Sequence, residues 1–343
     1  MKNLLPATIF FLLSLTCAAQ DVHFSQFYYS PFTLNPALTG SMDGQYRIGG
    51  IYKSQWGSIS APYVYSTPSI YGDIKLFSGG YTYNYLGVGL LLLNDKSGDG
   101  GLSNLTAMLS ASYHQALDKE GNYHIALGLQ GGMVQKKIDF TKLDFYDEFD
   151  GLGFNGLTSE HFDFYQIAYS DVSAGLSFDG LISNSSRVQL GASAFHLTTP
   201  KESFFVSNDS GSANVLNMRY VVHGSATFGV KSKFYIFPFV QYQLQNNDNE
   251  MVIGSNFGYN LSPNPRMAPT LFYVGVFSRV RYDIIPTIGV MMKGIQAGLS
   301  YDVNTSSDLN PATGGKGGFE LALVYTGNVQ QPKHYKKVYC PSF

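Results

Sequence analysis

The chain has few charges, few cysteines and no long apolar run. Lys, Arg, Asp and Glu make up 13% of its 343 residues, whereas they make up about a quarter of a typical globular protein. The net charge of −2 gives no electrostatic reason to bind nucleic acid or an anionic membrane surface. After the N-terminal leader the longest apolar run is Leu86–Leu93, and a membrane-spanning helix needs roughly 20 residues. These scarcities exclude a helical membrane protein and argue against a nucleic-acid partner.

The N-terminus has the parts of a secretory signal peptide. Lys2 supplies a positive charge, Leu4–Leu15 is apolar, and small residues end the leader. We predict that residues 1–19 are removed. Lipoprotein processing at Cys17 is the alternative, although the residues before this cysteine fit that signal poorly. Cleavage leaves one cysteine, Cys340, and hence no internal disulfide framework.

Aromatic residues and glycine are abundant, and they fall into alternating segments. The chain has 25 Tyr, 25 Phe and 37 Gly. Within the stretch 293–325, apolar residues at odd positions alternate with small or polar residues on both sides of a polar, glycine-rich loop. Side chains on a strand point to opposite faces with a period of two. The stretch therefore predicts a β-hairpin with one apolar face and one small or polar face.

Fourteen segments of this kind follow the N-terminal region. Their approximate ranges are 45–54, 62–77, 81–93, 103–116, 122–135, 165–179, 187–196, 218–230, 233–245, 250–260, 270–279, 282–292, 295–303 and 317–326. An even number of antiparallel strands of about ten residues each is typical of bacterial outer-membrane barrels. We predict an all-β, transmembrane, antiparallel outer-membrane β-barrel over residues 45–327, in which the last strand pairs with the first.

The links between these segments alternate in length. Long links fall at one predicted end (94–102, 136–164, 197–217, 304–316), and short links fall at the other (78–80, 117–121, 231–232, 293–294). Long outer loops and tight inner turns are expected of an outer-membrane barrel, and a soluble sandwich has no reason to alternate in this way. The link 261–269 is an exception, because it is fairly long and lies at the short-turn side. Closure is also required in lipid, where each unpaired backbone group costs several kcal/mol.

Residues 20–44 lack the alternation of strands. They hold five closely spaced aromatic residues, and two prolines interrupt them. We predict a short helix near residues 25–29 followed by a loop. The segment is too short to bury its own aromatic side chains, so we expect it to pack on the barrel as a periplasmic or lumenal segment that plugs the lumen. Residues 328–343 are the predicted periplasmic tail.

No motif indicates catalysis or metal binding. Gly151–Gly156 matches G-x-G-x-x-G but lacks the strand and helix of a dinucleotide site, so it predicts a loop tip. Residues 302–308 have the alternating oxygens of a calcium loop without its glutamate, which favours a polar turn. The acidic link 136–164 predicts a solvated outer loop, with a weak cation site as the alternative. No serine has a nucleophile-elbow context and no Cys/His grouping has zinc spacing. We predict no enzymatic activity and no cofactor, and we expect the strand histidines to face the lumen or the membrane interfaces.

Several stretches together match the pattern of one protein family. They are Gln20–Phe27, Leu34–Gly40, Arg47, Gln55-Trp56, Gly191–His196 with Pro200, Arg219, His223-Gly224, Gly298–Asn304, Gly317–Leu321 and Cys340–Phe343. With them the chain resembles the PorP/SprF family of type IX secretion-system outer-membrane proteins, found in Bacteroidota, over nearly the whole mature chain. One segment, Arg281–Pro286, departs from the pattern, because the family usually has an Asp-Ala-containing segment there.

The resemblance implies a non-enzymatic barrel that serves protein secretion or surface attachment. It implies periplasmic and outer-membrane type IX components as partners and, in gliding motility, delivery of a secreted surface protein, the client. We place the candidate partner-binding residues in the two ends that lack strands: Phe24, Phe27, Tyr28, Lys336, Lys337, Cys340, Pro341 and Phe343. The client would meet the long outer loops, and membrane lipid would surround the barrel. The alternatives are a passive transporter for a small solute and a structural barrel without a client.

Overall fold

The structure is a computed structural model that describes residues 21–57, 65–77, 83–98, 100–143, 145–149, 151, 153, 165–183, 185–204, 215–230, 233–262, 270–307 and 310–329. The predicted leader and nearly all of the predicted tail lie outside these residues. Within the described part, no helix is both long enough and apolar enough to cross a membrane.

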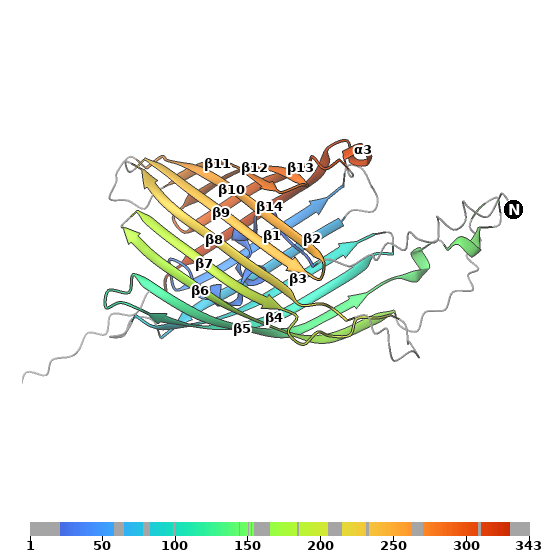
Figure 1. Ribbon diagram of the computed structural model, residues 1–343, viewed down its shortest axis with the longest axis horizontal. Helices are drawn as coiled ribbons and strands as arrows, with labels where there is room; N and C mark the ends of the chain where they lie inside the picture. The colour runs from blue at the N-terminus through green and yellow to red at the C-terminus, as the bar shows by residue number, and fades with distance from the viewer. Residues whose placement is uncertain are drawn as a thin grey trace, which may run out of the picture.

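Fourteen strands form one closed antiparallel barrel, as predicted (Figure 1). They are β1 (Tyr46–Gln55), β2 (Tyr65–Leu76), β3 (Tyr85–Ser97), β4 (Leu102–Ala116), β5 (Tyr123–Lys137), β6 (Gln166–Ser183), β7 (Ser186–Phe195), β8 (Arg219–Val230), β9 (Phe234–Gln245), β10 (Asp248–Asn260), β11 (Leu271–Arg279), β12 (Asp283–Met292), β13 (Ile295–Asn304) and β14 (Lys316–Gly327). The predicted pairing of the last strand with the first is confirmed, since Tyr46 lies opposite Gly327 and Gln55 lies opposite Gly318.

The period of two decides which side chains face outward. In β5, Ile125, Leu127 and Leu129 are exposed on the outer surface, whereas Ala126 and Gln130 are buried on the lumen side. The same alternation continues around the barrel, so large apolar side chains form a continuous exterior. A surface of this kind is unstable in water and suits contact with lipid. The lumen face instead carries small, polar and charged side chains.

The N-terminal segment, which we define as residues 21–44, lies inside the barrel (blue in Figure 1). It contains the short helices η1 (Phe27–Tyr29), α2 (Pro31–Leu34) and η2 (Pro36–Leu38). The helix predicted near residues 25–29 is thus a single 3₁₀ turn. Proline opens both later helices, where its missing N–H is tolerated and its fixed φ favours the first helical position. Nearly all side chains from Phe24 to Met42 are buried against the wall.

The two ends of the barrel differ. The end that carries links 138–165 and 196–218 is the long-loop end, and it includes η3 (Phe140–Lys142), η4 (Tyr146–Glu148) and α3 (Asn310–Thr313). The opposite end, where β1 begins and β14 ends, is the short-turn end. The alternation in link length is less regular than predicted, because the tight turns 246–247 and 280–282 also lie at the long-loop end.

Candidate functional site: the filled lumen

The N-terminal segment runs the length of the lumen. The Asp21 carboxylate contacts His196 and Arg219, which flank the long link 196–218. At the other end the Gln45 N–H donates to the Gly327 carbonyl at 2.8 Å, where β14 ends. The chain therefore enters at the long-loop end and leaves at the short-turn end, where β1 begins. Residues 21–44 thus contact the inner wall of the barrel, and closure of the lumen by them stays a prediction.

Glu320 on β14 holds the start of the segment by its main chain. Its two carboxylate oxygens accept the N–H groups of Ser25 and Gln26 at 2.7 and 2.9 Å. The Gln26 side-chain amide donates to the Glu320 carbonyl at 3.1 Å, and Lys53 lies 3.5 Å from the carboxylate. Glu320 is fully buried. Hydrogen bonds to a buried charge are stronger than neutral ones, and their loss is costly.

Arg279 on β11 joins the same region to neighbouring strands. It pairs with Asp283 and lies 3.2 Å from Glu250 and 3.5 Å from Asp302. One of its nitrogens also donates to the Ser25 hydroxyl at 2.7 Å, and that hydroxyl donates to Asp302 at 2.8 Å. Asp302 lies in β13, within the predicted strand 295–303, and faces the lumen. The polar turn predicted over residues 302–308 begins later than expected, because β13 continues through Asn304.

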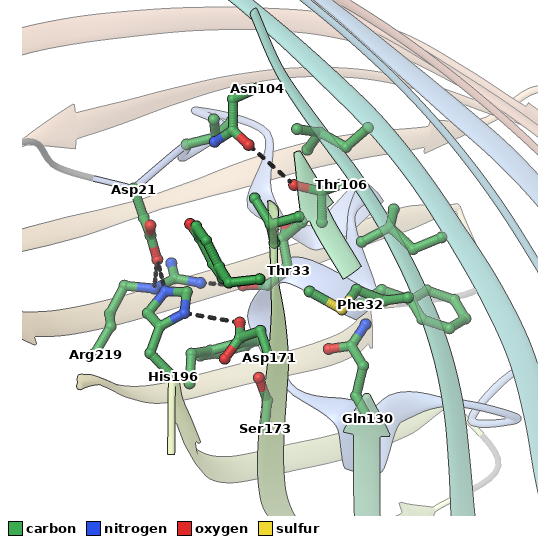
Figure 2. Close-up of a pocket in the computed structure, with 17 residues that line it drawn as sticks. Asp21, Phe32, Thr33, Asn104, Thr106, Gln130, Asp171, Ser173, His196 and Arg219 are labelled. Carbon is green, nitrogen blue, oxygen red and sulfur yellow. Dashed lines mark hydrogen bonds and ion pairs between the residues drawn. The ribbon is translucent and has the colours of Figure 1, made fainter. Parts of the chain in front are cut away.

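A second charged cluster, the Asp21 cluster, surrounds the first described residue (Figure 2). Asp21 pairs with His196 at 2.5 Å and with Arg219 at 3.0 Å, while His196 also contacts Asp171 at 2.8 Å. Burial alone would raise the pKa of Asp21, but the charges of Arg219 and His196 outweigh it and lower that pKa to about 2. Burial opposes protonation of His196, but hydrogen bonds to Asp171 and Asp21 raise its pKa to about 9. Asp21 is therefore ionised and His196 protonated near neutral pH.

The middle of the segment lies on wall positions that have no side chain. A Cβ added to Gly128 would lie 2.3 Å from the Ala37 nitrogen, and one added to Gly175 would lie 1.9 Å from the Asn35 side-chain oxygen. Asn35 itself donates to the Leu176 carbonyl at 2.9 Å and contacts His223 at 3.1 Å. Glycine is thus required at these wall positions by close approach of the segment.

A third set of charges, at the short-turn end, holds the last part of the segment. Arg47 on β1 donates two hydrogen bonds to Asp73 on β2, at 2.9 and 2.7 Å. The same carboxylate accepts the Gly40 N–H at 2.7 Å, and Arg47 also reaches the Leu38 carbonyl at 3.2 Å. The bidentate pair fixes both side chains in orientation. The segment is therefore bound by charged wall residues at both ends.

The aromatic residues predicted to bind partners contact the wall instead. Phe24 and Phe27 are 3% and 4% exposed. Tyr28 is half-buried, stacks on Phe239 with ring centroids 4.4 Å apart, and borders a cavity at the short-turn end. A partner can reach Phe24 and Phe27 only if the segment moves, and the role of all three side chains in partner binding stays a prediction. Lys336, Lys337, Cys340, Pro341 and Phe343 lie outside the described residues.

The lumen is not filled completely at the short-turn end. A cavity of about 470 Å³ lies between the segment and strands β1, β2, β6 to β8 and β11 to β14, and we call it the vestibule. Tyr28 and Tyr29 border it on the segment side, and Met42, Met291 and Met292 are among its other residues. Its size is within the range of roughly 300–1,000 Å³ that ligand pockets occupy.

Sequence analysis did not assign the residues that bind the segment this role, although Arg219 and Glu320 lie in stretches that match the family pattern. Lys53, Asp73, Arg219, Arg279 and Glu320 all occupy inward positions of their strands. The sequence does contain one indication of an occupied lumen. Charged residues recur at the inward positions of the strands, and glycines occupy other inward positions. This pattern predicts an occupied lumen, but a period of two does not tell which charge meets which across the barrel.

Comparison with solved structures shows barrels of similar architecture. The Ralstonia pickettii toluene transporter TbuX matches with a TM-score of 0.48 and 11% identity, over 85% of this chain and 91% of that one. The P. putida toluene transporter TodX matches with a TM-score of 0.47 and 10% identity, over 87% and 93% of the two chains. No curated protein matches the sequence.

The family comparison covers most of the chain. Residues 16–325 match the family model of the type IX secretion system membrane protein PorP/SprF. The match includes the N-terminal segment and all but the last residues of the barrel. The closed antiparallel barrel with an apolar exterior agrees with a location in the outer membrane. The chain belongs to the PorP/SprF family of type IX secretion system membrane proteins.

Proposed function

We propose that this protein is an outer-membrane component of the type IX machinery that acts by binding and not by conducting solutes or catalysing a reaction. The N-terminal segment closes the lumen. The long-loop end faces the cell exterior and meets a secreted surface client. The short-turn end, with the tail 328–343, faces the periplasm and docks other components of the machinery.

The observation that carries this proposal is how the segment is attached. Charged wall residues bind its main chain near both ends, and glycines on the wall make room for its middle. Breaking one buried pair typically costs about 3–5 kcal/mol. A segment attached in this way supports a barrel that stays closed and serves as a rigid platform.

Co-purification tests the proposal. The tagged full-length protein would be extracted in mild detergent, and the proteins that remain bound would be identified. We expect type IX components and a secreted surface protein to be recovered with it. A barrel recovered without either of them would contradict the proposal.

The tail provides a second test. Residues 330–343 lie outside the described residues, but their sequence includes three lysines and one histidine, which favour an acidic partner surface. Deletion of Val338–Phe343 is expected to leave the barrel in the outer membrane and to abolish display of the client. Surface labelling of the client measures this, and normal display in the deletion variant would exclude the tail from docking.

The vestibule gives specific support to one alternative, passive transport of a small solute. Its volume of about 470 Å³ suits a small ligand. This alternative predicts uptake of a solute into liposomes and a solute-specific growth defect when the protein is deleted. Binding of machinery components without any uptake would favour docking.

A further inference from the structure

A crevice opens toward the long-loop end, between the N-terminal segment and strands β3 to β6 (Figure 2). Its volume is about 70 Å³. One water needs roughly 10–15 Å³, and an engineered cavity of about 150 Å³ holds benzene. The crevice is therefore too large for a single water and suits a group of a few heavy atoms, such as one aliphatic side chain.

The two walls of the crevice differ in chemistry. On one wall, Leu91, Leu93 and Met108 are buried beside Phe32. On the other wall the Gln130 amide is 4% exposed, and its side-chain nitrogen finds no hydrogen-bond partner among the described residues. Figure 2 shows this nitrogen directed into the space beside Phe32. A buried donor without an acceptor costs about 1–3 kcal/mol, so a ligand that offers a carbonyl oxygen gains by meeting Gln130.

The rim of the crevice favours an uncharged group. Asp21, Asp171, His196 and Arg219 line it, and they already pair with one another. A charged ligand would be desolvated here without gaining a free partner of opposite sign. The ligand that fits is therefore neutral, apolar at one side and equipped with a hydrogen-bond acceptor.

The link that joins β5 to β6 adds a constraint on what surrounds that group, because both of these strands line the crevice. Link 138–165 carries seven acidic residues and one lysine in its sequence. Such a loop attracts basic ligands as they approach. The segment also lies beneath the crevice, so a solute that entered it would not find a way through the barrel. Both features favour a polypeptide that docks over a solute that passes.

We propose that the crevice receives one aliphatic side chain and the adjoining main-chain carbonyl of the secreted client, from a stretch in which basic residues flank the aliphatic one. The carbonyl accepts the free hydrogen of the Gln130 amide, and the side chain packs on Leu91, Leu93 and Met108. This inference rests on the proposed function, because it names the surface by which the long-loop end holds its client.

The test uses N-acetyl-leucine methylamide as the probe, an uncharged residue with one aliphatic side chain and two carbonyls. Its binding to the full-length mature protein in detergent micelles would be followed by saturation-transfer NMR. Leu93→Trp fills the crevice and is expected to weaken binding about tenfold, which equals about 1.4 kcal/mol. Leu92→Trp on the outer face of the same strand is the matched control, with an affinity close to that of the unmodified protein. N-acetyl-glycine methylamide should not bind.

Equal affinity in the Leu93→Trp and Leu92→Trp variants would overturn the inference, as would a probe that does not bind at all. Gln130→Met keeps the shape of the side chain, removes the donor and is expected to weaken binding severalfold.

Co-purification of the client distinguishes a failure of the crevice as the client site from a failure of the proposed function. A client retained by Leu93→Trp, with probe binding lost, contradicts the crevice as the client site and leaves the proposed function standing. A client lost from Leu93→Trp and kept by Leu92→Trp supports both.

Discussion

At the scale of single residues, the lumen is a set of buried charges that are matched to one segment. Glu320 illustrates the arrangement, because both of its oxygens accept main-chain N–H groups and Lys53 lies next to it. The wall binds the main chain of Ser25 and Gln26, and it also binds their side chains, since the Ser25 hydroxyl contacts Arg279 and Asp302 and the Gln26 amide donates to the Glu320 carbonyl. A substitution of Glu320 should therefore loosen the segment at these residues.

Replacement of Glu320 by Gln tests this arrangement. The amide can accept only on one side, and it leaves Lys53 without a carboxylate, so we expect the folded state to lose about 2–4 kcal/mol. The temperature at which the folded barrel unfolds in detergent should fall. The matched control is Glu120→Gln, in an exposed turn between β4 and β5, which should change that temperature very little. Equal unfolding temperatures for both variants would contradict the role of Glu320.

The Asp21 cluster predicts a dependence on pH. His196 has a pKa raised to about 9 from 6.5, so the stabilisation it provides is complete below pH 6.5 and is lost as the pH rises through 9. Asp21 has a pKa lowered to about 2, so its contribution is lost only in strong acid. Between pH 7 and 10 the start of the segment should therefore loosen. Hydrogen exchange of the main chain at Val22–Phe24, corrected for the intrinsic effect of pH, measures this.

His196→Gln is the control for that experiment. Glutamine does not titrate, so the variant should exchange faster than the unmodified protein at pH 7, and its protection should then stay level up to pH 9. A fall in protection of the same size in both proteins would assign the pH effect to other groups.

At the scale of elements, the strands follow from the sequence far better than the segment does. All fourteen predicted strands are present, and the pair that closes the barrel is correct, because period-two alternation reports directly which face meets lipid. Lumenal packing of residues 20–44 was expected from their aromatic residues. The hydrogen bonds and ion pairs made by Glu320, Asp73 and Asp21 could not be predicted. They join residues far apart in sequence, and their pairing depends on the curvature of the closed sheet.

Glycines on the barrel wall leave room for the middle of the segment, and this close contact can be tested. Gly128→Ala places a Cβ 2.3 Å from the main chain of the segment, so we expect the part of the segment at residues 35–39 to shift and the barrel to lose stability. Gly131→Ala on the same strand meets its nearest atom at 3.7 Å and should be tolerated. Hydrogen exchange at Ala37–Thr39 distinguishes the two variants. Unchanged protection in Gly128→Ala would show that the segment does not depend on this close contact.

At the scale of the whole molecule, an apolar exterior surrounds a lumen that is occupied over its length and open as a vestibule at one end. Such a molecule is suited to present two different surfaces on the two sides of a membrane. Its long-loop end and its short-turn end would then serve different partners of the secretion machinery.

Ion conductance in planar lipid bilayers tests the central claim, that the N-terminal segment keeps the barrel closed. The mature protein would be compared with a variant that lacks residues 21–40, and gel mobility without heating would verify that both are folded. We predict that the mature protein inserts without steady conductance and that the deletion variant conducts through the emptied lumen. Steady conductance of the same size from both proteins would contradict the account.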